Sequence, residues 1–309
     1  MNIARIHTDD EFRLGIVDGD ELALIDMPLG PGQGVEALYS LRTGAGDNLL
    51  PDAAAKLLSD AVSGGPRVAL ADVRLTAPVP KPEKIFAAGL NYADHIAESN
   101  LEPPDTPLIF AKYANTVCGP FDDIQRPVVS RQLDYEGELG VIIGRRCRHV
   151  PKERAYEVVA GYVVLNDVTV RDWQEATSQW CIGKSFDTHC PVGPWMTSAD
   201  AVDPGDMRIR TWVNGEPRQE SNTRHLLFGV DDLIAYVSQA CTLQPGDVIA
   251  TGTPGGVAES MDPPAFLVDG DEVRVEVEGI GTINNRVVDE EKVEPIEMAG
   301  LPGFGHEPV

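Results

Sequence analysis

The sequence predicts an α+β fold that is rich in β-structure, and three observations predict it. Residues 1–75 combine a hairpin pattern with one helical pattern, which is typical of a small N-terminal α+β domain. The closely spaced prolines of residues 78–84 favour an extended linker. Beyond it, short apolar runs alternate with glycine and proline, and helical patterns are few. We therefore expect a small N-terminal domain, 1–75, and a larger strand-rich domain, 76–309, built as a barrel or rolled sheet.

In the N-terminal domain, the sequence predicts a β-hairpin followed by a helix. Apolar residues alternate with polar ones over 12–16 and again over 22–25, on either side of a turn at Asp18-Gly19. The helix begins after Asp52, continues through helix-forming residues with an apolar stripe, and ends at the Ser-Gly-Gly of 63–65.

In the larger domain, four elements are clear enough to predict individually. They are a strand pair around Asn214-Gly215, a helix 152–160 closed by Gly161, a helix 231–240, and a strand that turns Val273, Val275 and Val277 inward.

Composition places the chain among ordinary globular proteins. It has 309 residues, 42% of them hydrophobic and 24% charged, enough for one large core or two modest ones. No apolar run approaches the roughly 18 residues that span a bilayer, and the acidic residues 9–11 stand where a secretory signal would be cationic and then apolar. The five cysteines show no pairing or zinc-type spacing. We therefore expect a cytoplasmic protein with reduced, mostly buried thiols.

The formal net charge of −24 argues against nucleic acid and membrane partners, because it repels phosphate backbones and anionic lipids. The same charge repels an anionic substrate. A site for such a substrate therefore needs arginine or lysine side chains of its own.

Glu136 and Glu138 are the first candidates for chemistry. They stand two residues apart before an apolar run, so on a strand their side chains share one face. Two adjacent carboxylates are stabilised by a cation, and oxygen ligands suit Mg²⁺, Mn²⁺ or Ca²⁺. The alternative is a solvent-exposed strand face.

A third carboxylate, Asp167, follows an apolar run at a predicted strand end and precedes Arg171. The alternative here is a surface turn with an internal ion pair. Lys184 is flanked in sequence by Trp180, Phe186 and Trp195, an apolar setting that favours a partnered ammonium able to stabilise an oxyanion. An ordinary lysine with its head group in solvent is the alternative.

His95 and Glu98 lie three residues apart on a predicted short helix, where the carboxylate can orient the imidazole as a general base. A surface pair is the alternative. The region 93–107 has the proline-rich composition of a loop able to act as a lid. The glycine-rich segment 246–257 offers backbone amides and the hydroxyl of Thr253, but it has neither P-loop nor dinucleotide-binding order.

Taken in order, six motifs resemble those of the fumarylacetoacetate hydrolase family over about residues 83–290. They are GLNYxxHxxE, DYEGEL, NDVxxRDxQ, QWxxGKxFD, GPW and TGTPxGV. The resemblance implies a mixed β-sandwich or β-roll, a homodimer or larger assembly, and Mg²⁺ or Mn²⁺ held by the matching carboxylates Glu136, Glu138 and Asp167, with Ca²⁺ as an alternative. Asp94 matches a further family carboxylate poorly, and we leave it out of the metal set.

The resemblance also implies roles for the other residues. His95 and Glu98 match the pair that activates water, and Lys184 matches the lysine that stabilises an oxyanion or enolate. The substrate-contacting positions correspond to Tyr92, Arg171, Gln174 and Thr253.

The implied activity is metal-dependent hydrolysis of a C–C bond in an acylpyruvate or 2,4-dioxo acid, because the complete His–Glu pair is present. An oxaloacetate-type decarboxylase and a 2-hydroxyhepta-2,4-diene-1,7-dioate-type isomerase are the alternatives on the same site. A non-catalytic protein that binds an organic acid is a further alternative.

Overall fold

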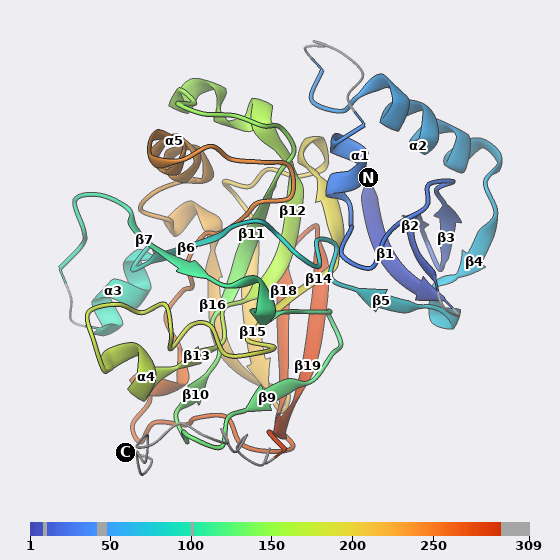
Figure 1. Ribbon diagram of the computed structural model, residues 1–309. Helices are drawn as coiled ribbons and strands as arrows, with labels where there is room; N and C mark the ends of the chain where they lie inside the picture. Colours follow the sequence, from blue (N-terminus) through green and yellow to red (C-terminus); the bar gives the residue numbers. More distant parts are fainter. Residues whose placement is uncertain (9–10, 42–47, 100–101, 292–309) are drawn as a thin grey trace, which may run out of the picture.

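The computed structural model describes residues 1–8, 11–41, 48–99 and 102–291, which form a strand-rich α+β fold (Figure 1). The largest sheet mixes antiparallel and parallel pairs, which confirms the predicted fold class. Its strands run in the order β4 (Arg67–Ala69), β3 (Glu21–Leu24), β2 (Glu11–Asp18), β1 (Asn2–Thr8), β14 (Cys190–Ser198), β12 (Val159–Asn166), β11 (Gly137–Ile143), β17 (Val248–Ala250), β6 (Ile85–Gly89) and β7 (Leu108–Lys112), while β5 (Arg74–Thr76) pairs with β1 and β8 (Val117–Cys118) with β14.

Two smaller sheets and several short helices complete the described fold. The five-stranded sheet has the order β16 (Glu216–Asn222), β15 (Arg208–Val213), β18 (Glu272–Val277), β19 (Gly281–Asp289) and β9 (Ile124–Arg126), and the two-stranded sheet pairs β10 (Leu133–Asp134) with β13 (Thr169–Val170). The α-helices are α1 (Glu36–Tyr39), α2 (Asp52–Gly64), α3 (Ala93–Ser99), α4 (Arg171–Glu175) and α5 (Val230–Ala240). The 3₁₀ helices are η1 (Leu70–Asp72), η2 (Ala114–Thr116), η3 (Lys152–Val158), η4 (Ala199–Ala201), η5 (Thr223–His225) and η6 (Ala258–Ser260).

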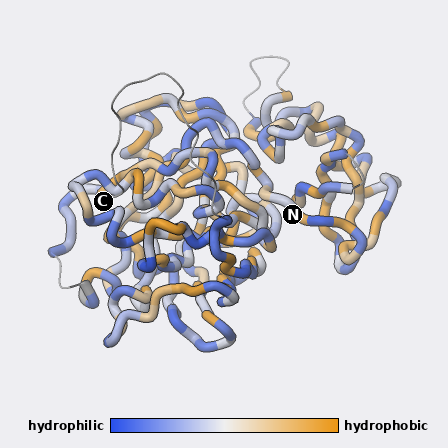
Figure 2. The backbone as a smooth tube through the Cα atoms, turned by 60° about the horizontal axis from the view of Figure 1, so that its bottom comes forward, coloured by the Kyte–Doolittle hydropathy of each residue, from blue (hydrophilic) through white to orange (hydrophobic). Residues whose placement is uncertain are grey.

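The N-terminal residues form a lobe beside the main body, as Figures 1 and 2 show. The predicted hairpin and helix are present as β2, β3 and α2, and Gly19 in the hairpin turn has a φ of 62°. β1 pairs with β14, so the strands of the lobe extend the large sheet. Side chains of the lobe also share a hydrophobic cluster with β12, β14 and β17. The boundary after residue 75 stays a prediction.

Strands β11 and β12 occupy the centre of the molecule, and every residue of both is buried. Alternate side chains point to opposite faces of a strand. Accordingly, Leu139 and Val164 join the cluster beneath the five-stranded sheet and α5, whereas Ile142 and Leu165 join the cluster beneath the N-terminal lobe. Burial on both faces explains why these two strands read as continuous apolar runs.

Three of the four predicted elements of the larger domain are confirmed. Asn214 and Gly215 join β15 to β16 with φ of 53° and 80°, the left-handed conformation that a primed hairpin turn needs. The helix predicted at 231–240 is α5. The valines of β18 are fully or almost fully buried.

The prediction for residues 152–161 was partly wrong, because a helix is present but its type, its end and the role of Gly161 differ. The chain forms the 3₁₀ helix η3 and enters β12 at Val159, so Gly161 lies inside a strand and ends no helix. A Cβ on Gly161 would stand 2.2 Å from the carbonyl oxygen of Thr197 in β14. The glycine is needed for the close approach of two strands, a requirement that local sequence does not reveal.

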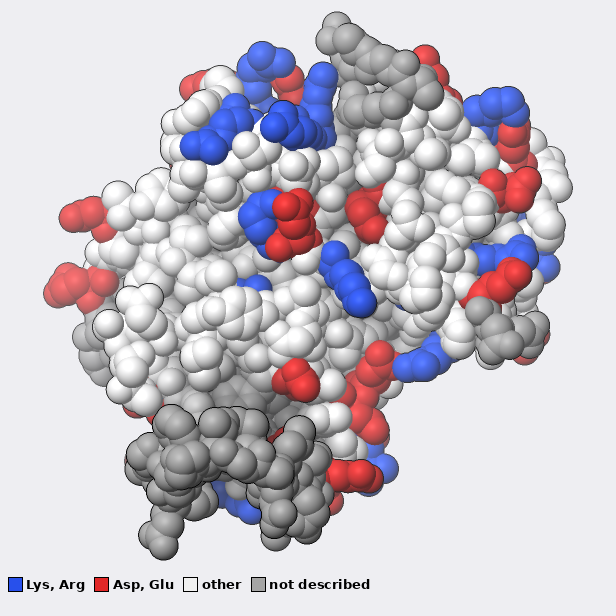
Figure 3. Space-filling model, in the orientation of Figure 1, with Lys and Arg blue, Asp and Glu red and all other residues white. Residues whose placement is uncertain are grey.

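The surface and the thiols add two observations. On the face drawn in Figure 3, acidic and basic side chains lie in small groups, some mixed and some of one sign, separated by uncharged surface. No helix among the described residues is long and apolar enough to cross a membrane. All five cysteines are free thiols, two of them buried and three partly buried.

Candidate metal and active site

Three carboxylates meet where β11 and β12 lie side by side. Glu136 and Glu138 flank Gly137, which pairs with Asn166, and Asp167 directly follows Asn166. One carboxylate oxygen from each of the three acids lies within 4.8 Å of the others, and all three side chains are buried. The exposed strand face and the surface turn considered from the sequence are thus excluded. Buried, clustered oxygen donors suit a hard divalent cation.

Two buried lysines approach this cluster. Lys184 Nζ lies 2.6 Å from Glu136 Oε2 and 3.0 Å from Asp167 Oδ2. Lys112 Nζ, at the end of β7, lies 2.6 Å from Asp167 Oδ1 and donates to the carbonyls of Val168 and Lys184. Burial would lower the pKa of Lys184, but Asp167 and Glu136 outweigh it and raise that pKa. Lys184 is therefore held as an ammonium group against the carboxylates.

Glu138 is the carboxylate without a compensating cation. It is 1% exposed and forms no ion pair with a described residue. Its Oε2 accepts one hydrogen bond, 2.7 Å from the amide nitrogen of Gly252, where φ is +103°. Burial and repulsion from Asp167 and Glu136 raise its pKa well above the usual value. A bound divalent cation would stabilise the ionised form of Glu138, so the donor set fits a metal.

Arg171, at the start of α4, links the cluster to its surroundings. Its Nη2 lies 2.8 Å from Glu136 Oε1, its Nε donates to Asp134 Oδ2 at 2.9 Å, and its Nη1 donates to Gln174 Oε1 at 3.0 Å. Burial would lower the pKa of Arg171, but Asp134 and Glu136 raise it more. Burial would likewise raise the pKa of Glu136, but Lys184 and Arg171 hold it below the usual value. Arg171 thus orients a candidate metal ligand.

His95 and Glu98 lie on α3, as predicted. Nδ1 of His95 is 3.8 Å from Oε2 of Glu98, and the same oxygen accepts a hydrogen bond of 2.8 Å from the amide of Gly256. Burial would raise the pKa of Glu98, but hydrogen bonds from His95 and Gly256 hold it below the usual value. An ionised Glu98 can orient the imidazole and stabilise its protonated form. In the predicted lid, 93–107, residues 100 and 101 lie outside the described residues.

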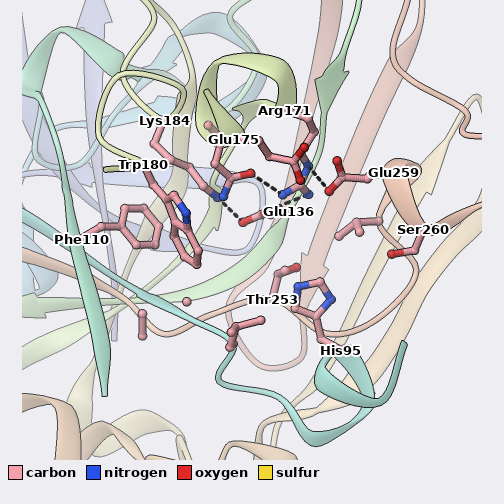
Figure 4. Close-up of a pocket in the computed structure, with 15 residues that line it drawn as sticks. His95, Phe110, Glu136, Arg171, Glu175, Trp180, Lys184, Thr253, Glu259 and Ser260 are labelled. Carbon is pink, nitrogen blue, oxygen red and sulfur yellow. Dashed lines mark hydrogen bonds and ion pairs between the residues drawn. The ribbon is translucent and has the colours of Figure 1, made fainter. Parts of the chain in front are cut away.

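A cavity of about 390 Å³ brings most of the predicted side chains together (Figure 4). Figure 4 shows His95 and Glu259 on one side and the rings of Phe110 and Trp180 on the other. Of the predicted residues, those that line the cavity are His95, Glu136, Arg171, Gln174, Lys184 and Thr253.

Two predicted substrate contacts have environments that limit what they can do. The Thr253 hydroxyl donates to the Gly137 carbonyl and accepts from Gln219 Nε2, so its proton is already engaged. Tyr92 is fully buried and is not among the residues that line the cavity. Its hydroxyl has no hydrogen-bond partner among the described residues.

The aromatic setting predicted for Lys184 was partly wrong. Its Nζ lies 5.1 Å from the centre of the Phe110 ring, which comes from the distant strand β7. Trp195 lies elsewhere, on β14, where its indole nitrogen donates to the carbonyl of Ile280. Closeness in sequence did not mean closeness in space, because strand β14 directs the Trp195 side chain away from the cavity.

Three residues of the site were not identified from the sequence. Lys112 ends an apolar strand, and a lysine in such a strand is an unusual signal that could have been used. Asp134 opens the DYEGEL motif and accepts hydrogen bonds from Arg171 and from the amides of Ala258 and Glu259. Glu259 lies on the short 3₁₀ helix η6, and no local sequence signal marks it.

Comparison with known proteins identifies the family. The model for the fumarylacetoacetate (FAA) hydrolase C-terminal domain matches residues 84–288, about two thirds of the chain. The chain belongs to the fumarylacetoacetate hydrolase family. This confirms the resemblance carried by the ordered motifs, and the described site lies within the matched residues.

Family members similar to this chain have different activities. The mitochondrial oxaloacetate tautomerase Fahd2a of Rattus norvegicus is 45% identical over 225 residues, which are 72% of each protein. A maleylpyruvate hydrolase from Sphingobium sp. SYK-6, solved in complex with manganese(II) and pyruvate, is 36% identical with a TM-score of 0.73. A 2-hydroxyhepta-2,4-diene-1,7-dioate isomerase from Mycobacterium marinum is 32% identical, also with a TM-score of 0.73. Each structural match covers 94% of this chain and 100% of the other.

Proposed function

We propose that this chain is a divalent-metal-dependent enzyme that interconverts the keto and enol forms of a small 2-oxo acid of the oxaloacetate type. The observation that carries the proposal is the buried carboxylate triad, in which Glu138 has no ion-pair partner among the described residues. Lys184 contacts this triad, and His95 belongs to the same site. The relative named as an oxaloacetate tautomerase has a higher identity, 45%, than the cited hydrolase and isomerase, 36% and 32%.

Glu136, Glu138 and Asp167 would hold Mg²⁺ or Mn²⁺. When bound, the ion supplies Lewis-acid polarisation of the 2-oxo group. Lys112, Lys184 and Arg171 hold two of the three carboxylates in place through ion pairs of 2.6–3.0 Å. A site positioned in this way needs little reorganisation when a ligand enters.

The residues of the chain divide the remaining work. His95, oriented by Glu98, takes the proton from the carbon next to the 2-oxo group and delivers it to the enolate oxygen, and the two transfers run backwards when the enol is converted to the keto form. The Lys184 ammonium stabilises the negative charge that develops on the oxygen. Arg171 occupies the carbonyl oxygen of the Gln174 side chain, which leaves the amide nitrogen of Gln174 to donate to the substrate carboxylate.

Hydrolysis of a C–C bond in an acylpyruvate or 2,4-dioxo acid is the second candidate. The observation that favours it is the His95–Glu98 pair at 3.8 Å, which can equally draw a proton from water. The attacking water would require a second carbonyl two carbons from the first. The enolate left by bond cleavage would then be stabilised by the same lysine.

One substrate screen separates these reactions. The enol absorbance of oxaloacetate, pyruvate release and CO₂ release are followed with Mg²⁺, with Mn²⁺ and with a chelator, on oxaloacetate and a panel of acylpyruvates. We expect metal-dependent enol–keto conversion without pyruvate release. Pyruvate from acylpyruvates would establish the hydrolase instead, and pyruvate with CO₂ from oxaloacetate the decarboxylase. If wild type and His95→Ala both bind the 2-oxo acids in a metal-dependent way but turn none of them over, the chain is a binding protein and the proposal is overturned.

A further inference from the structure

The lysine and arginine side chains of the cavity are already paired. Arg171 and Lys184 are the two such residues that line it among the described residues. Lys184 contacts Glu136 and Asp167 at 2.6 and 3.0 Å. Arg171 is shared between Glu136 and Asp134 at 2.8 and 2.9 Å. Both cations lie beside the carboxylate cluster, so the rest of the described lining offers no lysine or arginine to a distant group of a substrate.

Two carboxylates line the same cavity outside the metal triad. Glu175 ends α4 and is exposed, and Glu259 on η6 keeps 35% of its side chain accessible. Glu259 Oε2 lies 3.4 Å from Arg171 Nε. Asp134 accepts hydrogen bonds from the amides of Ala258 and Glu259, at 2.8 and 3.1 Å, and so fixes the backbone that carries the Glu259 side chain.

Glu259 lies near one guanidinium, that of Arg171, and near three other carboxylates. Burial raises the pKa of Glu259, and the carboxylates Glu175, Asp134 and Glu136 raise it further, against the lowering effect of Arg171. A second anion placed beside Glu259 would be repelled by its carboxylate and by that of Glu175, which lines the same cavity. The Arg171 guanidinium is already ion-paired with Asp134 and Glu136, so it attracts a further anion less strongly.

We propose that Glu259, together with Glu175, determines specificity by excluding 2-oxo acids whose second carboxylate lies far from the 2-oxo group. The preferred substrates are then short 2-oxo acids, or longer ones with an uncharged tail. The second carboxylate of a four-carbon acid would stay close to the anchored 2-oxo acid end, whereas that of a six- or seven-carbon diacid would extend along the lining, whose carboxylates outside the cluster are Glu175 and Glu259. This inference rests on the proposed function, because it takes the carboxylate cluster as the anchor for the 2-oxo acid end.

The test uses a pair of ligands that differ in one distal charge, 2-oxoadipate and its 6-methyl ester. Their dissociation constants are measured by calorimetry with the Mn²⁺-loaded protein, alongside that of oxaloacetate. We expect the wild type to bind the ester about tenfold more tightly than the diacid. Glu259→Gln should reduce this preference and Glu259→Lys should abolish or reverse it. High salt should also weaken the preference, because exposed charges are screened.

The matched control is Glu153→Lys, which changes the net charge equally on exposed η3, outside the residues that line the cavity. It should leave the ratio of the two dissociation constants unchanged. Melting temperatures establish whether each variant is folded. If Glu259→Lys does not fold, Glu259→Gln still tests the proposal.

The outcomes separate this inference from the proposed function. If oxaloacetate and both probes bind only with metal, but the ratio is the same in wild type and Glu259→Gln, the specificity assignment is wrong and the function stands. If none of the three ligands binds in a metal-dependent way, the proposed function fails. A ratio that shifts equally in Glu153→Lys would also overturn the assignment, because net charge alone would then account for it.

Discussion

At the scale of single residues, Glu138 is the side chain on which the metal assignment depends. Glu136 and Asp167 already have lysine or arginine partners, but Glu138 is 1% exposed and, among the described residues, its hydrogen-bond partner is a backbone amide. A buried carboxylate without a cation destabilises the metal-free fold, whereas a bound cation reverses the sign of its contribution. Glu138 should therefore lower the folding stability of the metal-free protein and raise that of the metal complex.

Glu138→Gln should separate these two effects. We expect the metal-free variant to melt at a higher temperature than metal-free wild type, because a buried charge has been removed. Its dissociation constant for Mn²⁺ should rise by about tenfold or more, because a ligand oxygen is lost. Calorimetry gives the first quantity and Mn²⁺ titration the second. Unchanged Mn²⁺ affinity would contradict the assignment of Glu138 as a ligand.

His189 gives a prediction about pH. It is completely buried, its Nε2 lies 2.8 Å from the carbonyl oxygen of Gln125, and burial lowers its pKa to about 3. The unfolded chain protonates histidine near pH 6.5, so between pH 6.5 and 3 the unfolded state binds more protons than the folded state. This contribution to stability is complete above pH 6.5 and is lost as the pH falls, by up to about 1.4 kcal/mol per pH unit.

His189→Gln should therefore flatten the acid side of the stability curve. The free energy of unfolding, measured with denaturant between pH 7 and 4, should fall less steeply in the variant than in wild type. The exposed His225→Gln is the matched control and should keep the wild-type slope. Equal slopes in wild type and His189→Gln would show that the buried imidazole does not contribute.

At the scale of elements, the close packing of β12 against β14 positions the metal cluster. Gly161 of β12 passes so near the backbone of β14 that a Cβ would stand 2.2 Å from the carbonyl oxygen of Thr197 and 2.8 Å from Met196 Cγ. The far end of β12 leads directly into Asp167. A change in this packing should therefore reach the site along the strand.

Gly161→Ala tests this coupling. We expect a loss of about 1–3 kcal/mol in the free energy of unfolding, from overpacking against backbone, together with weaker Mn²⁺ binding. Gly64→Ala, at the end of α2, is the control, because a Cβ there meets nothing within 4 Å. Helix propensity predicts that the control is neutral or stabilising by up to about 1 kcal/mol. Similar losses in both variants would disprove the packing argument.

At the scale of the whole molecule, the N-terminal lobe and the catalytic body share both a sheet and a core. β1 pairs with β14, and one hydrophobic cluster contains Leu14 and Leu58 of the lobe together with Val163 and Val192 of the body. Parts that share a core tend to unfold together. The homodimer expected from the family resemblance stays a prediction, which light scattering can test.

We accordingly expect a single calorimetric transition for the 309-residue chain. Its van't Hoff enthalpy of unfolding should be close to its calorimetric enthalpy. The same measurement tests the predicted boundary after residue 75. Two resolved transitions, the first confined to probes in the lobe, would establish an independently folding N-terminal domain.

The sequence alone determined the fold class, the hairpins at Asp18-Gly19 and Asn214-Gly215, and the carboxylates that cluster. These features are encoded locally, because turn residues need particular φ values and alternate residues of a strand share a face. Tertiary structure decided what distance along the chain conceals. Lys112, Asp134 and Glu259 reach the site from three separate segments, and Gly161 serves the approach of a neighbouring strand. The three carboxylates could be recognised in the sequence, at one predicted strand and one predicted strand end. Their burial and their pairing with lysine and arginine could not, because both arise only when the strands pack together.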